Sequence, residues 1–351
     1  MLRQACKEDG LLGKGLLIMN YIVFDLEWNQ SNAGVSSKVE GLPFEIIEIG
    51  AVRLSGDGTL ESEFNELIRP QVYKEMHRIT GKIVHLTMEE LKHSRTFPEV
   101  ATRFEMWCGE SPFLFCTWGT LDVMELQRNR KFFYMMPLTE KPLPYLDVQK
   151  LFALTYDAEE PRKRRSLQDA IDYLHIEKHV PFHRAFSDAY YTAKVLQVLM
   201  QVNPRILSRV SYDVFYPPTS RETEVRHQFD TYFKYISRTF PGKKELLADN
   251  EVSSSKCYLC RRNLKKKVRW FTTNNRNYVC LAYCEIHGYL KGKIRVNKTP
   301  EGEVFAVKTT RLVDEATAAE VEKKWERIQN SKNKDEEYVV PDPSEIGDAQ
   351  D

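Results

Sequence analysis

The chain has 351 residues, of which 42% are hydrophobic and 29% charged, and its formal net charge is +1. These values exclude a low-complexity chain and allow two folded domains with cores of ordinary size. No stretch approaches the roughly 18 consecutive apolar residues of a membrane span, and we find no secretion signal with a small-residue cleavage site. We therefore expect a cytoplasmic protein with no membrane contact.

Predicted strands and helices alternate through the first part of the chain. The apolar run YIVFDL at 21–26 is rich in β-formers, which indicates a buried strand, and Gly-Asp-Gly at 56–58 indicates a hairpin turn. The expected strands are 21–26, 45–54, 61–69, 113–117 and 143–148, and the expected helices are 98–108, 120–131, 149–154, 167–174 and 187–202. This order predicts a mixed α/β sheet flanked by helices.

The pattern changes after residue 204. Short segments punctuated by Pro, Gly and Ser are followed by short predicted strands over 257–310 and a predicted helix over 313–330. Because Met19 directly precedes the first strand, we expect the residues before it to add little to function. The predicted organisation is an N-terminal extension (1–18), an α/β domain (19–204), a connecting region (205–256), a smaller β-rich domain (257–330) and an acidic, disordered tail (331–351).

The small net charge conceals two segments of opposite sign. Between Lys256 and Lys298 there are twelve Lys and Arg residues against one acid, Glu285. Residues 331–351 contain seven acids against two lysines. We expect the first segment to contact a polyanion and the second to be a solvated tail.

Two carboxylates end the first predicted strand. Side chains two positions apart on a strand project to the same face, so Asp25 and Glu27 aim at one point. Two adjacent carboxylates repel each other, and a divalent cation is their natural counter-charge. The alternative is a solvated strand end, because the D-x-E pattern is common by chance.

Three further residues fall where they can reach the same edge of the sheet. Asp122 follows the fourth predicted strand and opens a helix. His183 stands five residues before Asp188, which lies in the first turn of the last predicted helix. The alternatives are helix capping or a favourable helix-dipole interaction for the two Asp residues, and an exposed loop position for His183.

Together these residues resemble the DnaQ-like exonucleases of the DEDDh type. That family has D-x-E on its first strand, Asp after the fourth strand, and H-x4-D opening the last helix. The segments EIIEIGAV (45–52), HRITGKIVHLT (77–87) and SLQDAIDYLHIE (166–177) are also similar, although Lys82 interrupts the usual T-G-I pattern. The resemblance covers about residues 20–203 and is nearest to the ribonuclease T-like and sporulation-inhibitor-like branch.

The resemblance implies a ribonuclease H-like fold with a mixed five-stranded sheet, and a 3′→5′ exonuclease with a two-metal mechanism. On this basis Asp25, Glu27, Asp122 and Asp188 would hold two Mg²⁺ or Mn²⁺ ions. His183 would take a proton from the attacking water, a task that suits its near-neutral pKa. The products would be nucleoside 5′-monophosphates.

The same resemblance implies contacts to the terminal nucleotide. Leu26 and Glu27, with Thr80 and Gly81, would lie against it. The rings of Trp28 and Trp118 are candidates for stacking on bases, with ordinary core packing as an equal alternative. Ribonuclease T-like relatives are often dimers, which leaves a homodimer open here.

Four clustered cysteines resemble a zinc ribbon. In C-x2-C-x19-C-x3-C each close pair can form one knuckle, and the thiolates of Cys257, Cys260, Cys280 and Cys284 would hold one structural Zn²⁺. The second pair has three intervening residues where two are usual, which leaves His287 as a substitute for Cys284. The alternative is a group of free buried thiols.

The cysteine cluster lies within the basic segment. Lys265, Lys266, Lys267 and Arg269 precede two aromatic residues, and this mixture of cations and rings favours contact with single-stranded RNA or DNA. We therefore predict an exonuclease on single-stranded RNA or DNA. The competing hypotheses are a nucleic-acid-binding protein on an inactive exonuclease fold and a zinc-ribbon protein that recruits a partner.

Overall fold

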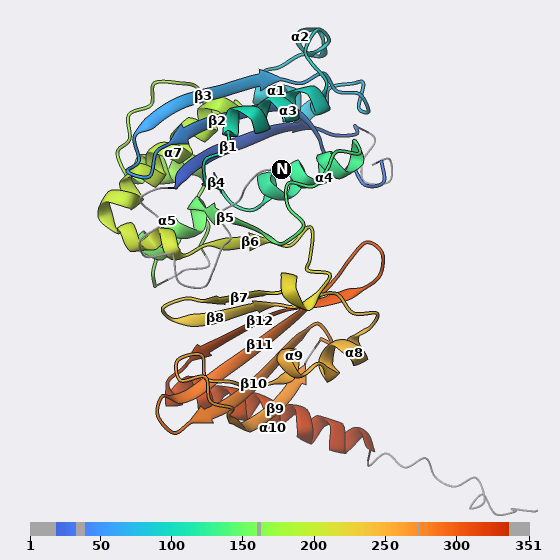
Figure 1. Ribbon diagram of the computed structural model, residues 1–351, viewed down its shortest axis with the longest axis vertical. Helices are drawn as coiled ribbons and strands as arrows, with labels where there is room; N and C mark the ends of the chain where they lie inside the picture. Colours follow the sequence, from blue (N-terminus) through green and yellow to red (C-terminus); the bar gives the residue numbers. More distant parts are fainter. Residues whose placement is uncertain (1–18, 33–38, 160–162, 273, 337–351) are drawn as a thin grey trace, which may run out of the picture. The chain divides into compact units, whose positions relative to one another are not determined.

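The computed structural model describes residues 19–32, 39–159, 163–272 and 274–336. The chain divides into two compact units, with the boundary between Tyr216 and Pro217, and each unit contains one six-stranded sheet (Figure 1). The predicted extension at 1–18 lies outside the described residues, as does the predicted tail from residue 337 onward. Residues 331–336, which were expected to begin the disordered tail, instead complete the last helix, α10 (Glu315–Glu336), and this corrects the predicted boundary. None of the described helices combines the length and apolar character that crossing a bilayer demands.

The sheet of the first unit begins as an antiparallel meander, continues with two strands parallel to the first strand, and ends with a short antiparallel strand. In sheet order the strands are β3 (Leu60–Leu67), β2 (Glu45–Leu54), β1 (Asn20–Asn29), β4 (Phe113–Thr117), β5 (Leu143–Asp147) and β6 (Ser211–Asp213). The expected mixed, ribonuclease H-like sheet is confirmed. The sixth strand, β6, was not predicted, because three residues are too few to show a periodic pattern.

Helices cover both faces of this sheet. Alternation along β1 sends Tyr21 and Val23 into the core beneath α5, α6 and α7, and sends Ile22 and Phe24 into the core beneath α3 and α4. The helices are α1 (Arg78–Val84), α2 (Met88–Leu91), α3 (Phe97–Cys108), α4 (Leu121–Phe132), α5 (Val148–Tyr156), α6 (Leu167–Tyr173), α7 (Ala185–Val202) and the 3₁₀ helix η3 (Pro204–Ser208).

The beginning of α7 lies directly on β2. A Cβ atom at Gly50 would collide with the backbone of Phe186, so this position has no room for a side chain. Asp25 is the register partner of Gly50 on the neighbouring strand β1. The missing side chain at Gly50 therefore brings the first turn of α7 close to the carboxyl end of β1.

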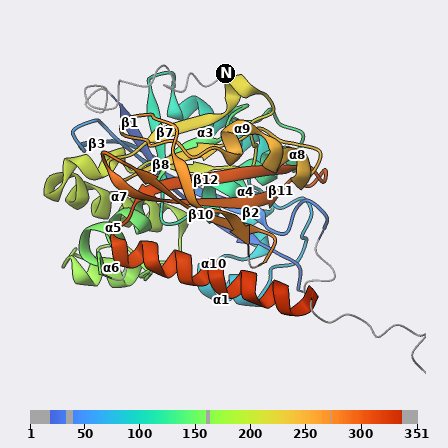
Figure 2. The same ribbon diagram turned by 90° about the horizontal axis from the view of Figure 1, so that it is seen from below.

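The second unit is an antiparallel sheet with a helix layer on each face. Its strands, in sheet order, are β7 (Val225–Gln228), β8 (Tyr232–Ile236), β12 (Val304–Leu312), β11 (Gly288–Lys298), β10 (Asn277–Cys284) and β9 (Lys265–Thr272). One face packs against α8 (Lys243–Ala248) and α9 (Asn250–Ser253), and the other against α10 (Glu315–Glu336) (Figure 2). A short 3₁₀ helix, η4 (Arg221–Thr223), precedes β7.

The region expected to connect the domains contributes to both units. Residues 204–213 form η3 and β6 of the first unit, whereas β7 and β8 belong to the second sheet. The short strands β7 and β8 pair with each other, and β8 pairs on its other side with β12, some 70 positions further along the chain. Strands of four and five residues show little periodicity, and a local pattern does not reveal the distant partner, so the segment resembled a linker.

Candidate functional site

The carboxyl end of β1 and the beginning of α7 bring three acidic side chains together. One carboxylate oxygen from each of Asp25, Glu27 and Asp188 lies within 4.8 Å of the others. Asp25 and Glu27 come from the same face of β1, and Asp188 comes from the first turn of α7. Three of the predicted acids, which lie near opposite ends of the domain in the sequence, thus form one cluster in the structure.

Asp122 lies beside this cluster rather than within it. Its side chain is only 5% exposed, in the first turn of α4, and its Oδ1 accepts a hydrogen bond of 3.3 Å from the Leu26 amide. That amide stands between Asp25 and Glu27. Asp122 is therefore tied to the strand that carries the first two acids.

Burial raises the pKa of every acid in this group, and neighbouring negative charges act in the same direction. Burial is the larger cause at Asp25, followed by the charges of Asp122 and Asp188. The same two effects raise the pKa of Glu27 to about 8. Burial also raises the pKa of Asp122 and of Asp188. Anionic oxygens crowded in this way suit a hard divalent cation such as Mg²⁺ or Mn²⁺.

His183 is exposed and precedes α7 in a left-handed conformation, with φ of 67°. Its backbone amide donates a hydrogen bond of 3.4 Å to Asp188 Oδ1. A left-handed backbone is uncommon outside glycine, and such strain concentrates at functional sites. The main chain of His183 is therefore linked to one acid of the cluster, while its ring remains open to solvent.

A buried ion pair beside the cluster was not predicted. Glu48 on β2 is fully buried opposite Glu27, and its carboxylate accepts hydrogen bonds from Arg184 Nε and Nη2 at 2.8–3.2 Å and from the Ala185 amide at 3.3 Å. Arg184 directly follows His183. An acid inside the apolar run EIIEIGAV was the available signal, because a buried charge requires a partner.

The residues expected to contact the nucleotide are placed as follows. The Leu26 side chain is 3% exposed and belongs to the core, so only its main chain faces the acids. Trp28 packs on Phe44 with ring centroids 5.5 Å apart. Trp118 packs on Phe152 at 6.2 Å. Both tryptophans are half-buried, and Thr80 and Gly81 are half-buried on α1.

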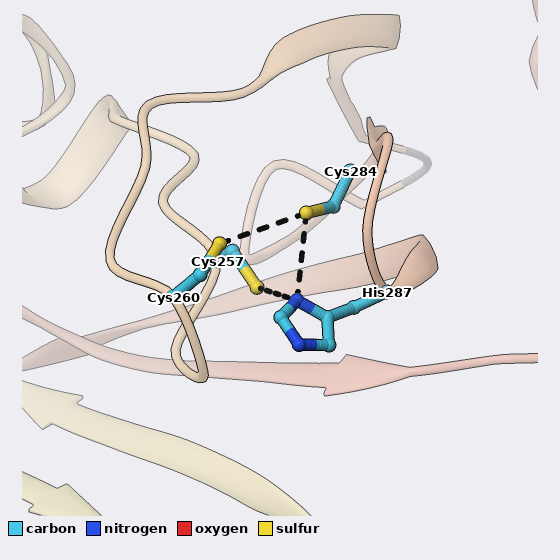
Figure 3. A group of neighbouring side chains, drawn as sticks. All are labelled: Cys257, Cys260, Cys284 and His287. Atoms are coloured by element: carbon cyan, nitrogen blue, oxygen red, sulfur yellow. Dashed lines mark hydrogen bonds between the residues drawn. The ribbon is translucent and has the colours of Figure 1, made fainter.

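The second unit contains a group of four sulfur and nitrogen atoms. Cys257, Cys260, Cys284 and His287 each direct one such atom to a common point, and all four atoms lie within 4.8 Å of one another (Figure 3). His287 Nδ1 is 3.4 Å from Cys257 Sγ and 3.6 Å from Cys284 Sγ, and the sulfurs of Cys260 and Cys284 are 3.7 Å apart.

This group has the chemistry of a structural zinc site. Three thiols and one imidazole form a closed four-ligand set of the kind that Zn²⁺ prefers. Burial opposes ionisation of Cys284, but hydrogen bonds from the backbone of Ile286 and His287 and from the His287 side chain lower its pKa to about 6. A thiol that ionises readily suits metal binding, because the thiolate is the ligand.

Cys280 lies outside this group, which corrects the predicted ligand set. Its thiol is buried, and its Sγ lies 3.7 Å from Ser255 Oγ. The sulfur packs against Gly292, where an added Cβ would collide with it. Cys280 and Cys284 share a strand, and four residues of strand span about 13 Å. His287 joins Cys284 across the turn between β10 and β11 instead, with the usual spacing of two intervening residues. His287 therefore takes the place of Cys280, and Cys284 remains in the set.

Comparison with known proteins gave a family match for the first unit. The exonuclease family model RNase_T matches residues 22–196. None of the curated proteins compared with the chain matches it.

Several solved structures are similar to part of the chain. Cell-death related nuclease 4 (CRN-4) is 17% identical with a TM-score of 0.45, and the match covers 53% of this chain and 65% of that one. The nuclease domain of 3′hExo, a DEDDh family member bound to rAMP, is 18% identical with a TM-score of 0.45, covering 52% and 92%. E. coli Exonuclease I in complex with a dA16 oligonucleotide is 12% identical with a TM-score of 0.46, covering 75% and 55%. The chain spans less than two thirds of the first and third of these proteins.

Proposed function

Because the chain belongs to the exonuclease family over residues 22–196, we propose that it is a metal-dependent 3′→5′ exonuclease that releases nucleoside 5′-monophosphates from single-stranded RNA or DNA. The observation that carries the proposal is the cluster of Asp25, Glu27 and Asp188. Asp122 adds a fourth acid through its hydrogen bond to the intervening amide. Carboxylates are assembled in this way at a cost in repulsion, which a bound cation offsets.

The four acids would hold two Mg²⁺ or Mn²⁺ ions, which when bound stabilise the charge on the attacking and leaving oxygens of the phosphodiester. His183 would accept a proton from the attacking water. Its exposed ring and its position beside Asp188 support this role, and imidazole is basic enough near neutral pH.

The remaining predicted contacts belong to the same proposal. The main chain at Leu26, together with Thr80 and Gly81 on α1, would position the terminal nucleotide. The half-buried rings of Trp28 and Trp118 would each offer an edge to a base, since each ring packs on an aromatic neighbour and keeps partial exposure. The Cys257, Cys260, Cys284 and His287 group would hold one structural Zn²⁺, which orders the second unit.

The test is a digestion of 3′- and 5′-labelled single-stranded RNA and DNA, with and without added Mg²⁺ or Mn²⁺. We expect metal-dependent loss of nucleotides from the 3′ end by the wild-type protein and none by Asp188→Ala. Asp172→Ala is the matched control, because Asp172 is an exposed acid paired with Lys178, and we expect it to behave as wild type.

The same assay separates the competing hypotheses. Binding of the labelled strands without turnover under either metal would contradict the enzyme and favour a nucleic-acid-binding protein on an inactive fold. The absence of both binding and turnover would favour a protein that recruits a partner through its second unit.

A further inference from the structure

A row of cations lies on one face of the sheet in the second unit. Lys291, Lys293 and Arg295 alternate along β11 with buried residues, so the three side chains share a face at intervals of about 6.6 Å. Arg311 on β12 is the register partner of Lys291 and extends the row sideways. We refer to these four residues as the β11 basic row.

The row lies on the face of the sheet that α10 covers in part. Val279 and Leu281 of β10 are the register partners of Lys293 and Lys291, and both β10 residues belong to the core cluster that includes α10. Beyond the helix the sheet face is open, because Lys293, Arg295 and Arg311 are exposed. The basic row therefore forms a surface beside the helix.

None of the four cations forms an ion pair with another residue that the structure describes. Burial lowers the pKa of Lys291, and the charge of Arg311 adds to this effect. Lys324 of α10 and Lys293 also lower it, whereas Glu320 raises it. Like charges therefore crowd one another along this surface.

Two arginines of the same unit are neutralised within the fold. Arg226 and Arg238 both contact the buried carboxylate of Glu224, at 2.7 Å and 3.1 Å, and Arg238 also reaches Asp249 at 3.2 Å. No acid lies within ion-pair distance of the β11 basic row, in the part of the chain that the structure describes, although the same unit pairs some of its cations internally. Four like charges on one face of the sheet without such acids point to an anionic partner from outside.

The aromatic residues that the sequence associated with this basic segment are not part of the surface. The Trp270 indole donates a hydrogen bond of 2.7 Å to the Ser253 carbonyl and packs in one core, and Phe271, 8% exposed, packs in the other. Burial therefore excludes base stacking on Phe271, and the half-buried Trp270 ring is held in place by its hydrogen bond to Ser253. The β11 basic row itself consists of flexible cations, which match phosphates rather than bases.

We infer that the β11 basic row binds the phosphodiester backbone of the single-stranded nucleic acid, at a surface separate from the carboxylate cluster. The inference rests on the proposed substrate class and adds a second point of contact to it. Contacts to phosphates carry no sequence information and are weakened by salt. Binding at this surface is thus independent of sequence and strongly dependent on ionic strength.

The test compares the full-length double variant Lys293→Gln and Arg295→Gln with its parent. Both proteins carry Asp188→Ala and are studied without added Mg²⁺ or Mn²⁺, so that binding is measured without turnover. The affinity for labelled single strands is measured by fluorescence anisotropy over a range of salt concentrations. We expect weaker binding, and a slope of log affinity against log salt that is shallower by about 1.4, at about 0.7 for each phosphate that the variant no longer neutralises.

The matched control is Lys243→Gln with Lys244→Gln on α8, which packs against the opposite face of the sheet. It removes the same charge and is expected to leave the slope unchanged. Arg311→Gln provides an independent variant on the neighbouring strand, with an expected decrease of about 0.7. Thermal unfolding confirms that each variant is folded.

An affinity and slope unchanged from the parent in both the double variant and Arg311→Gln would overturn the inference. Equal losses in the α8 control would do the same, because they would show a general effect of net charge. A wild-type protein that binds strands but does not hydrolyse them contradicts the exonuclease proposal alone. If the wild-type protein hydrolyses the strands but the variants have the same salt slope as their parent, only the inference about the β11 basic row is contradicted.

Discussion

Arg184 connects the loop of the proposed general base to the sheet. Its guanidinium is held by the buried carboxylate of Glu48 through three hydrogen bonds. His183 directly precedes Arg184, and its own backbone amide donates a hydrogen bond to Asp188. The loop therefore has two anchors, and Glu48 would act on the proposed reaction through the position of His183 rather than by contact with substrate.

We predict that Glu48→Gln lowers kcat roughly tenfold to a hundredfold, the range expected when a catalytic group is displaced by about 1 Å, and changes KM little. Steady-state kinetics on a labelled single strand measure both constants. Lys178→Ala, which breaks the exposed Lys178–Asp172 pair, is the control and is expected to have no effect. A kcat equal to that of the wild type in Glu48→Gln would show that the pair serves folding alone.

Glu27 gives the site a pH-dependent stability in the absence of metal. Burial and neighbouring acids raise its pKa from 4.5 to about 8 in the folded protein. The protonated form is thus favoured by folding. This contribution is complete below about pH 4.5 and is lost as the pH rises through about 8, since the unfolded state has already released its proton and the folded state then releases its own.

We therefore predict that Glu27→Gln melts at a higher temperature than the wild type at pH 8 without added divalent metal. Each kcal/mol gained corresponds to roughly 2–4 °C in a domain of this size. Thermal unfolding followed by circular dichroism measures the difference, which should shrink as the pH falls toward 4.5. A variant less stable than the wild type at pH 8 would contradict the repulsion described for this cluster.

The β10–β11 hairpin determines which cysteines can share a metal. Cys284 ends β10 and His287 lies in the turn before β11, so the two side chains meet. Cys280 lies four residues earlier on β10, and its thiol is beside Ser255. Strand geometry thus separates two cysteines that appear as a pair in the sequence.

We predict one zinc ion per chain in the wild-type protein and in Cys280→Ser, and loss of zinc in Cys284→Ser. The physical reason is that only Cys284 contributes to the closed ligand set. Mass spectrometry of the purified, dialysed proteins gives the metal content. Retention of zinc in Cys284→Ser together with its loss in Cys280→Ser would restore the arrangement expected from sequence.

The two units have separate hydrophobic cores and different groups of candidate metal ligands. The first unit surrounds its sheet with two clusters of buried residues, and the second has its own on either face of β7–β12. The cluster of carboxylates lies in the first unit, and the group of three thiols and one imidazole lies in the second. Ligands that bind only the folded state stabilise the unit that contains their site.

At the scale of the whole chain, we predict two thermal unfolding transitions. Added Mn²⁺ should raise the midpoint of one, and removal of zinc by a chelator of soft metals should lower the midpoint of the other. Differential scanning calorimetry resolves both. The double variant Cys257→Ser and Cys260→Ser is the control for the chelator and should shift the same transition. One transition that responds to both metals would show that the chain unfolds as a single cooperative unit.

Sequence patterns predicted the elements whose information is local. Strands such as 21–26 and 45–54 are strongly apolar. His183 and Asp188 are only five residues apart, at the beginning of one helix. The pairing of β8 with β12 and the contact of Glu48 with Arg184 join distant segments. Such contacts depend on the finished topology, and the sequence offered only indirect signs of them, such as an acid in an apolar strand.

The absence of a side chain at Gly50 also has a consequence for how the protein folds. Gly50 meets Phe186 across most of the length of the first unit, and loop closure over such a separation is slow. Until that contact forms, Asp188 is remote from the two acids on β1. A partly folded chain therefore lacks the complete set of acids, so binding of a metal by all three carboxylates would require α7 to be docked and would report that step of folding in the first unit.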